Sequence, residues 1–458
     1  MAKKMSGLKK ETSSFSELND MLSKFSPDGA IIDDSVYARI DEWIPTGSYI
    51  LNAAMSGSLF GGMPNRRSFM LAGEEGTGKT YLAMSIVRSA QAMGYFPIYY
   101  DSEGAIDIEF VKKLGIDISK FRLENVNTIE EFATLTAKLN ETIENIRKSG
   151  KTPPKIIVVL DSLGSLSSIK EKDDTTTGNN KRDMTKQQAI RRTFRVVGSD
   201  FAKNAVPFVI CNHVYASIGS FMGGNTISGG GGGKYSPSIM FVLTKSKLSD
   251  KDSEEHVQKK GLDKYTKIGI VVTCHPFKQR FARPIKVQIH IPFYKKPNPF
   301  VGLEKFVNWK SCGIVRGKML TKKDFRKLTP AEQKKCNSFL IPIKDLKDGD
   351  DGTRYAYARD TARSLVCEHL HGEIPISELY TAKVFTDEVL HKLDENIIKE
   401  TFMLPSIESL EDLAEVTGDL LDGAEMGDGK FEDEDLTEDL TEDIDTTCID
   451  KLTGDKKN

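Results

Sequence analysis

Apolar runs of six or seven residues alternate with long amphipathic stretches through the first half of the chain. Four of these runs predict strands: residues 68–73, 95–101, 155–161 and 207–213. The runs at 155–161 and 207–213 are continuous enough to predict buried strands. Between them, apolar positions recur every three or four residues, which predicts helices over residues 80–94, 128–150 and 184–205. This alternation predicts an α/β fold built on a mixed, mainly parallel twisted sheet.

The pattern changes in the second half of the chain. Three apolar runs follow one another without long helices between them, at residues 238–248, 268–275 and 285–293. We therefore predict that the sheet ends in antiparallel strands. Residues 299–405 are mixed and polar, with helices expected near 360–371 and 386–400, and we interpret them as a small C-terminal α+β domain.

Two terminal segments flank this central part, which we place at residues 41–298. Residues 1–40 are predicted to be an arm for subunit–subunit contact, with one amphipathic helix whose apolar positions are Phe15, Leu18, Leu22 and Phe25. Residues 406–458 hold 19 acidic and 4 basic side chains and a doubled LTED sequence. Such a segment has too little apolar surface to fold, so we expect a disordered acidic tail.

The formal net charge of −2 conceals an asymmetry between this tail and the rest of the chain. Residues 406–458 carry a net charge of −15, which leaves +13 on residues 1–405. A basic body with an acidic tail indicates a polyanionic partner and an internal competitor for it, although a tail that only aids solubility explains the charges equally well. No apolar run is long enough for a membrane span, and no two cysteines have Cys-x-x-Cys spacing, so we expect a reduced, cytoplasmic protein.

A phosphate-binding loop lies between the first buried run and the helix that follows it. The sequence GEEGTGKT fits the pattern G-x-x-x-x-G-K-[S/T] in the strand-to-helix context that the motif requires. The glycines let backbone N–H groups surround phosphates, and the helix N-terminus adds partial positive charge. We predict that Lys79 reaches the β- and γ-phosphates of ATP and that the Thr80 hydroxyl binds Mg²⁺. The predicted nucleotide contacts are Gly73, Glu74, Glu75, Gly76, Thr77, Gly78, Lys79 and Thr80.

Two carboxylates follow other predicted strands. Asp161 ends the run at 155–161, where α/β sheets bind ligands, and is the expected acidic partner for Mg²⁺. Glu103 lies two residues beyond the strand that ends at Asp101, and we predict that it activates water for hydrolysis. An exposed carboxylate without a catalytic role is the alternative for Glu103.

The order of these motifs resembles that of the RecA strand-exchange ATPases. The segments that carry the resemblance are PTGS…GEEGTGKT (45–80), YYDSEGAIDIEFVKKLGIDI (99–118) and IIVVLDSLGSL (156–166). FVICNHVY (208–215) followed by GGGGGKYSPSIMFVL (229–243) is similar to the phage, UvsX-like branch of that family. The resemblance covers about residues 40–295 and implies a RecA-like P-loop core for residues 41–298.

The resemblance implies further roles around the nucleotide. Asp107 and Phe110 fall where the family contacts adenine, with Phe in place of the family's Tyr, and His213 falls at its γ-phosphate sensor position. Lys278 and Arg280 match two cations that reach the ATP of a neighbouring subunit. Arg280 departs from the bacterial lysine, and two ordinary surface cations are the alternative for this pair.

The family also implies two DNA-binding loops. Residues 217–238, with eight glycines among 22 residues, fall at the second loop, where backbone amides approach phosphates and Phe221 and Met222 wedge between bases. Residues 168–186 fall at the first loop, although Asp173 and Asp174 weaken that assignment. The candidate DNA contacts are Lys170, Lys172, Lys181, Arg182, Arg191, Arg192, Phe221, Met222, Gly223, Gly224, Gly229, Gly230, Gly231 and Lys234. For the arginines at 191, 192 and 195, a solvated helix face is the alternative.

These observations predict a DNA-dependent ATPase that exchanges DNA strands as a helical filament, in homologous recombination, repair and recombination-dependent replication. Its expected ligands are ATP and Mg²⁺, and its expected partners are single-stranded and duplex DNA, further copies of itself, a phage single-strand-binding protein and a recombination mediator. The protein would act in the cytoplasm, that of the host if it is of phage origin. A RecA-fold replicative helicase and a non-enzymatic protein that coats single-stranded DNA are the alternatives.

Removal of the tail tests whether its charge competes with DNA. We expect truncation after about Asp419 to strengthen DNA binding at low Mg²⁺, most visibly for duplex DNA, because the tail and DNA compete for one basic surface. High Mg²⁺ would shrink the difference by screening. Fluorescence anisotropy of labelled DNA across a Mg²⁺ series measures this, and superimposable curves for both chains would contradict it.

Overall fold

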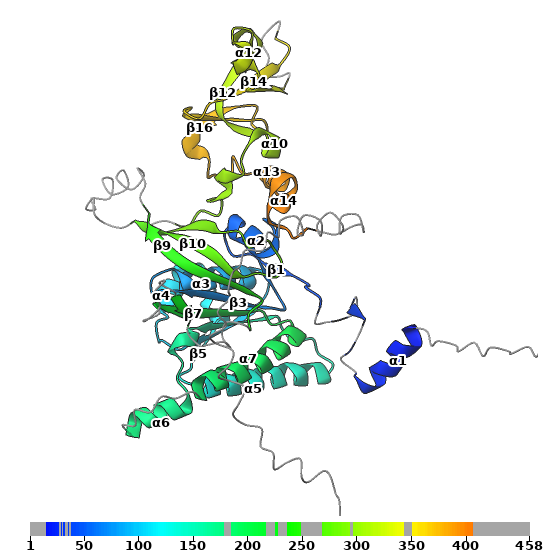
Figure 1. Cartoon of the computed structure of the whole chain (residues 1–458), viewed down its shortest axis with the longest axis vertical. Coiled ribbons are helices and arrows are strands. Elements are labelled where there is room, and N and C mark those ends of the chain that lie inside the picture. The colour runs from blue at the N-terminus through cyan, green and yellow to red at the C-terminus, as the bar shows by residue number, and fades with distance from the viewer. Residues whose placement is uncertain are drawn as a thin grey trace, which may run out of the picture. The chain divides into compact units, whose positions relative to one another are not determined.

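The computed structural model describes residues 15–405 except for 27–28, 30, 33–34, 36–37, 178–184, 217–224, 228–235, 249–267, 294–295 and 343–349. The chain divides into a compact unit that ends at Leu404 and a second unit from Pro405 onward, almost all of which lies outside the described residues. The first unit holds three sheets, of two, nine and five strands, and Figure 1 shows helices beside the larger ones. The expected boundary near residue 299 stays a prediction.

The larger sheet has nine strands in the order β11-β10-β9-β3-β7-β6-β4-β5, with β8 (Asn225–Ile227) paired to β7. Six strands run parallel: β3 (Ser68–Gly73), β4 (Phe96–Asp101), β5 (Arg122–Asn125), β6 (Ile156–Asp161), β7 (Phe208–Ala216) and β9 (Ile239–Lys247). At one side of the sheet, β10 (Gly269–Lys278) is antiparallel to β9, and β11 (Val287–Pro292) is antiparallel to β10. The predicted mainly parallel sheet with antiparallel closure is therefore confirmed.

Helices cover both faces of this sheet, and the side chains of its strands alternate between two cores. In β3, Phe69 and Leu71 pack with α2 (Tyr49–Ser56) and α3 (Lys79–Ala92) on one face. Met70 and Ala72 pack on the other face with the helices α5 and α7. Because both faces are covered, the strand has to be apolar at every position, which explains its continuous hydrophobic run.

The helices α5 (Ile129–Lys148) and α7 (Thr185–Asn204) lie side by side beneath the sheet in Figure 1. The Thr128 hydroxyl accepts a hydrogen bond from the N–H of Glu131 and caps α5, as its sequence indicates. The remaining elements of this region are β1 (Trp43–Ile44), β2 (Met63–Pro64), α1 (Phe15–Phe25), α4 (Ile108–Lys113) and α6 (Ile169–Thr177).

The C-terminal part holds a five-stranded antiparallel sheet in the order β13-β14-β12-β15-β16. Its strands are β12 (Ile314–Thr321), β13 (Cys336–Leu340), β14 (Thr353–Ala358), β15 (Ser364–Cys367) and β16 (Gly372–Pro375). Its helices are α10 (Trp309–Cys312), α11 (Lys322–Phe325), α12 (Pro330–Gln333), α13 (Asp387–Leu393) and α14 (Lys399–Phe402), the last two joined by a π-helical turn (Asp394–Ile398).

The helix expected near 360–371 is wrong, because β15 and a turn occupy that stretch. Leu365 and Cys367 pack into one core and Val366 into another, and this two-residue period belongs to a strand. The helix expected near 386–400 is confirmed. Among the described residues, no helix is long and apolar enough to cross a membrane.

A buried carboxylate joins the C-terminal helices to the loop after α2. Asp394 is 2% exposed, and its two oxygens accept hydrogen bonds from the Ser58 hydroxyl at 2.8 Å and the Leu59 N–H at 2.7 Å. Next to it, the rings of Phe60 and His391 stack with centroids 4.2 Å apart. These contacts tie the C-terminal helices to the loop after α2.

Replacement of Asp394 tests how much this contact stabilises the fold. We expect Asp394→Ala to lower the free energy of unfolding by about 2–3 kcal/mol, because a buried N–H and a hydroxyl lose their acceptor. Asp360→Ala, at an exposed turn, is the matched control. Urea unfolding curves measure both variants, and equal midpoints would contradict the expectation.

Candidate nucleotide site and arginine pocket

The phosphate-binding loop connects the end of β3 to the start of α3. Gly76 and Gly78 adopt φ of 69° and 87°, in the left-handed region that favours glycine. A Cβ atom on Gly78 would also lie 2.5 Å from Cδ1 of Ile291, so a side chain there would displace the end of the Ile291 side chain. Gly76 and Gly78 are thus required by the backbone shape of the loop.

Lys79 and Thr80 open α3 inside this loop. The Lys79 ammonium donates to the carbonyl oxygens of Gly73 and Glu74 at 2.8 and 2.9 Å, and burial lowers its pKa. The Thr80 hydroxyl donates to Oδ2 of Asp161 at 2.6 Å. The predicted phosphate cation and the predicted Mg²⁺-binding hydroxyl therefore lie in the same cradle.

Asp161 lies at the end of β6, close to Thr80. Its Oδ2 also accepts a hydrogen bond from the Tyr99 hydroxyl at 2.6 Å, and the residue is 7% exposed. Burial raises the pKa of this carboxyl, and the hydrogen bonds from Thr80 and Tyr99 oppose that rise. A hydroxyl and a carboxylate side by side are the hard oxygen ligands that Mg²⁺ prefers, so the residues fit this ion.

Glu103 lies on the loop after β4, and one of its oxygens is heavily hydrogen-bonded. Oε1 lies 2.6 Å from the Ser162 hydroxyl, 3.0 Å from the Ser165 hydroxyl and 2.8 Å from Nε2 of His213. Burial raises the pKa of Glu103, but the hydrogen bonds from Ser162, His213 and Ser165 outweigh it, so the pKa lies below its ordinary value. The carboxylate is therefore ionised at neutral pH, as a general base has to be.

The loop that carries Glu103 is fixed by the buried carboxylate of Asp101. Its Oδ1 accepts hydrogen bonds from the N–H groups of Glu103 and Gly104, and its Oδ2 accepts one from Ile106. Because these bonds fix the loop backbone to Asp101, the end of β4 sets the point from which the Glu103 side chain projects.

One cavity of about 960 Å³ joins most of the predicted nucleotide contacts. Glu75, Gly76, Gly78, Lys79, Thr80, Glu103, Phe110, Asp161 and His213 line it. Its walls also include residues that sequence reasoning missed, namely Tyr81, Arg88, Lys113, Phe293 and Lys296. Asp107 is not among the lining residues, and its carboxylate instead caps α4 by accepting from the N–H of Phe110.

The two predicted interface cations lie at the opposite end of the sheet. Gly73 pairs with Leu243 on β9, and Lys278 pairs with Met240, three residues nearer the start of that strand. At ~3.3 Å per residue, Lys278 is set back by about 10 Å from the level where the phosphate-binding loop begins. Lys278 and Arg280 therefore lie away from the chain's own nucleotide site. This placement suits contact with a neighbouring subunit.

Arg280 belongs to a cavity of about 550 Å³ that we call the arginine pocket. Its cations are Arg66, Arg67, Arg191, Arg195 and Arg280, and the hydroxyls of Ser68, Ser199, Ser236 and Ser238 also line it. None of the described residues that line this cavity is acidic. The positive charge and the hydroxyl groups of this pocket suit an anion.

Like charges crowd one side of the arginine pocket. Burial lowers the pKa of Arg67, and the nearby charges of Arg280 and Arg66 lower it further. Arg66 is held by Asp41 and by the carbonyl oxygens of Ala202 and Lys203 at the end of α7. An anion in the pocket would relieve this repulsion.

Comparison with known proteins agrees with the geometry. Residues 18–289 match the RecA N-terminal domain. The chain belongs to the RecA family. A 206-residue stretch is 29% identical to a recombination and repair protein of Enterobacteria phage T4, covering 44% of this chain and 50% of that protein.

Two RecA proteins show similar identity. That of Treponema denticola is 28% identical over 219 residues, or 47% of this chain and 48% of the relative. That of Thermus aquaticus is 28% identical over 286 residues, or 59% of this chain and 75% of the relative. The chain thus spans about half the length of the phage T4 and Treponema relatives that it matches. The predicted family and its phage-type relatives are confirmed.

The predicted DNA contacts of this RecA-family chain are described only in part. Lys170 and Lys172 lie on α6, so the first loop begins as a helix where a loop was expected. Arg191 and Arg192 are exposed on α7, and Arg191 faces the arginine pocket. Ten candidates lie outside the described residues: Lys181, Arg182, Phe221, Met222, Gly223, Gly224, Gly229, Gly230, Gly231 and Lys234.

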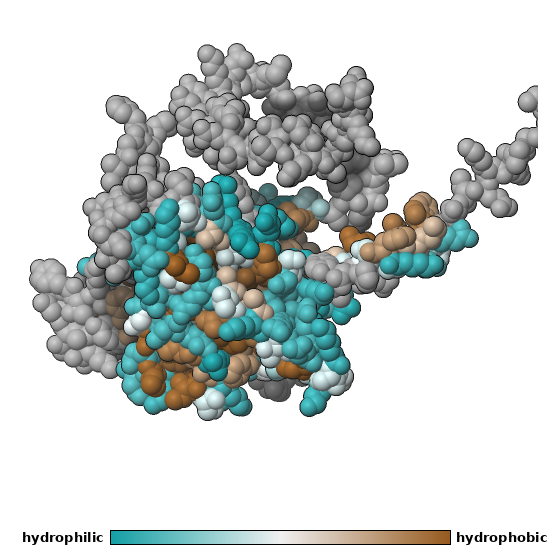
Figure 2. All heavy atoms as spheres, turned by 90° about the horizontal axis from the view of Figure 1, so that it is seen from below, coloured by the Kyte–Doolittle hydropathy of each residue, from teal (hydrophilic) through white to brown (hydrophobic). Residues whose placement is uncertain are grey.

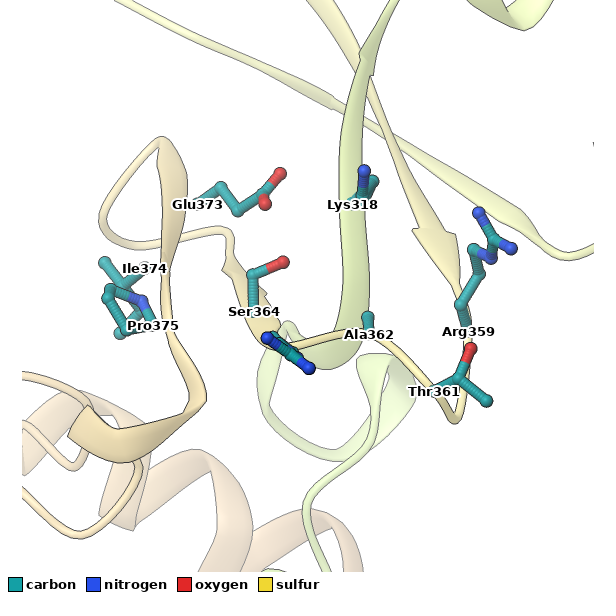
Figure 3. A pocket seen from close by; sticks show the side chains of 9 residues that line it. Lys318, Arg359, Thr361, Ala362, Ser364, Glu373, Ile374 and Pro375 are labelled. Carbon is teal, nitrogen blue, oxygen red and sulfur yellow. The ribbon is translucent and has the colours of Figure 1, made fainter.

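A second basic cavity, of about 620 Å³, lies on the C-terminal sheet (Figure 3). Lys318 of β12, Arg359 and Arg363 of the β14–β15 connection, and Ser364 of β15 line it, opposite Glu373 of β16. Three cations against one carboxylate leave it positively charged. No feature of the sequence singled out this group, because its members meet only when the antiparallel sheet forms.

Removal of the interface cations tests their role. We expect the double variant Lys278→Ala/Arg280→Ala to fold but to lose DNA-stimulated ATP hydrolysis by at least about 10-fold, because cations that act on a neighbour's phosphates are gone. Lys286→Ala, an exposed cation farther along the chain, is the matched control. Full ATPase activity of the double variant in filaments would refute the assignment.

Proposed function

We propose that this RecA-family chain is an ATP-dependent DNA strand-exchange recombinase that forms helical filaments on single-stranded DNA. The observation that carries this proposal is the division of the candidate catalytic groups between opposite ends of one sheet. The phosphate-binding loop, Asp161 and Glu103 lie at one end, and Lys278 and Arg280 lie at the other. A complete ATP site then requires two subunits in head-to-tail contact, which generates a ring or a helix.

ATP with Mg²⁺ is the proposed cofactor pair. The backbone of residues 73–80 and Lys79 would hold the phosphates, and Thr80 with Asp161 would hold Mg²⁺, which supplies charge neutralisation at the transferred phosphoryl group. Phe110 and Tyr81 offer ring faces to the base within the same cavity. Asp107 stays a weaker proposal for adenine, because its carboxylate is engaged at the start of α4.

Glu103 is the proposed general base. Its carboxylate is ionised at neutral pH and so can accept a proton from water, and its side chain is 36% exposed toward the cavity. His213 contacts the same carboxylate from β7, the strand that leads into the predicted second DNA loop. This contact supports the proposal that His213 reports the state of the nucleotide to that loop.

DNA is the proposed polyanion. Arg191 and Arg195 of the arginine pocket, with Lys170 and Lys172 of α6, would contact phosphates. The basic cavity on the C-terminal sheet is a proposed contact for duplex DNA. Binding through phosphates depends steeply on salt, so affinity for either DNA form would fall as salt rises.

Self-association is proposed to involve α1. Phe15 and Phe25 are 94% and 85% exposed, and Leu18, Met21 and Leu22 are about half exposed. Figure 2 shows the apolar side of this helix in brown. An amphipathic helix with an uncovered apolar face suits docking on another subunit. A single-strand-binding protein and a recombination mediator remain further proposed partners.

Replacement of the base tests the enzymatic proposal. We expect Glu103→Gln to bind ATP and single-stranded DNA normally but to hydrolyse ATP about 10²-fold or more slowly, because only water activation is lost. Glu109→Gln, an exposed change on α4, is the matched control. A coupled ATPase assay with and without single-stranded DNA measures both.

Turnover of Glu103→Gln at the wild-type rate would remove Glu103 from the mechanism. A wild-type chain that binds DNA without hydrolysing ATP would favour a coating protein. Rings without filaments, seen by electron microscopy on single-stranded DNA, would favour a helicase.

A further inference from the structure

Two segments of the chain contact Glu103, and each leads into a different predicted DNA loop. Ser165 ends a short 3₁₀ turn (Leu163–Ser165) and lies three residues before the first loop at 168–186. His213 lies four residues before the second loop at 217–238. Both contact the same oxygen, Oε1 of Glu103, at 3.0 and 2.8 Å.

The hydroxyl protons around Glu103 are too few for the contacts they make. Ser162 and Ser165 lie 2.6 and 3.0 Å from Oε1 and 2.9 Å from each other. Each hydroxyl carries one proton, and an ionised carboxylate only accepts hydrogen bonds. Two protons cannot serve three contacts, so one of the three contacts always joins two oxygens without a proton between them.

Departure of Ser165 resolves this shortage, because the Ser162 hydroxyl then has one proton and one acceptor, Oε1 of Glu103. Ser162 is fully buried and fixed, since its N–H donates to the Ser102 hydroxyl at 2.8 Å and its carbonyl accepts from that hydroxyl at 2.7 Å. Ser165 is exposed, and its hydroxyl contacts only Ser162 and Glu103 among the described residues. Ser165 is therefore the member of the network that moves at least cost.

We propose that Ser165 is a positioning residue that restrains Glu103 until DNA binds the adjoining first loop. The inference rests on the proposed function of Glu103 as the general base. With Ser165 in place, a third donor draws electron density from Oε1, and a carboxylate so engaged is a weaker acceptor for the proton of water. Movement of the segment that leads into α6 would withdraw Ser165 and leave the base to its two other donors.

Removal of the Ser165 hydroxyl would imitate this release. We expect Ser165→Ala to raise kcat for ATP without DNA by about two- to threefold, as loss of one donor restores basicity. KM for ATP should not change, because Ser165 is not among the residues that line the nucleotide cavity. With saturating single-stranded DNA the variant and the wild type should agree within about twofold, since DNA already withdraws Ser165.

Two further variants make the test specific to the hydroxyl. Ser165→Thr keeps a hydroxyl and should restore the wild-type ratio of stimulated to unstimulated kcat. Ser167→Ala removes a hydroxyl two residues farther on and should match the wild type, because within the described part of the chain Ser167 forms hydrogen bonds only through its backbone, to Asn127 and Ile129. Thermal unfolding of each variant checks that the fold is intact.

The outcomes separate this inference from the proposed function. A Ser165→Ala chain with wild-type kcat in the absence of DNA would overturn the inference, and so would an equal fall in both rates, which indicates a structural role. If single-stranded DNA does not stimulate ATP hydrolysis by the wild type, that result contradicts the proposed function and not the inference about Ser165. The kcat of Ser165→Ala without DNA then still tests the restraint on Glu103.

Discussion

The level ends of the parallel strands determine where the phosphate-binding loop and the candidate groups Glu103, Asp161 and His213 lie. Gly73 of β3 pairs with His213 of β7, and Asp101 of β4 pairs with Asp161 of β6. Four strands from distant parts of the chain thus bring the phosphate-binding loop, the proposed base, the proposed metal carboxylate and the proposed sensor to one edge of the sheet. A shift of one residue in any strand would turn its side chains to the other face and scatter the site.

That arrangement has an energetic cost, which the local contacts offset. Lys79 and Asp161 are both nearly buried, and burial acts against the charged form of each. Hydrogen bonds compensate: the ammonium donates to two backbone carbonyls, and the carboxylate accepts from Thr80 and Tyr99. Phosphates and Mg²⁺ complement these same groups, so ligand binding would complete a partly satisfied network.

Much of the fold and the core of the site could be predicted from the sequence. The apolar runs of β3, β4, β6 and β7 reveal buried parallel strands, and the spacing of GEEGTGKT fixes the phosphate-binding loop. Strand ends then indicate Glu103 and Asp161, because ligands bind there. Each of these features is formed by residues close together in the sequence, so a local sequence pattern is enough to predict it.

Features that depend on long-range pairing escaped prediction. Arg66, Arg67 and Arg280 are far apart in the sequence and meet only where the starts of β3 and β9 and the end of β10 come together. The stretch DSLGS shows that Ser165 closely follows Asp161. The residue that Ser165 contacts, Glu103, is 62 residues away in the sequence, so the contact itself could not be predicted. The sequence predicts a helix where the strand β15 forms, because the short apolar run there has no clear period outside the sheet.

The central claim is that each ATP site is built from two subunits. Mixing two inactive variants, Glu103→Gln and Lys278→Ala/Arg280→Ala, tests it most directly in a DNA-stimulated ATPase assay. In equal mixtures that assemble at random, about a quarter of the interfaces pair an intact Glu103 with intact cations, so hydrolysis should return to about a quarter of the wild-type rate. A mixture no more active than its two components measured alone would contradict the account.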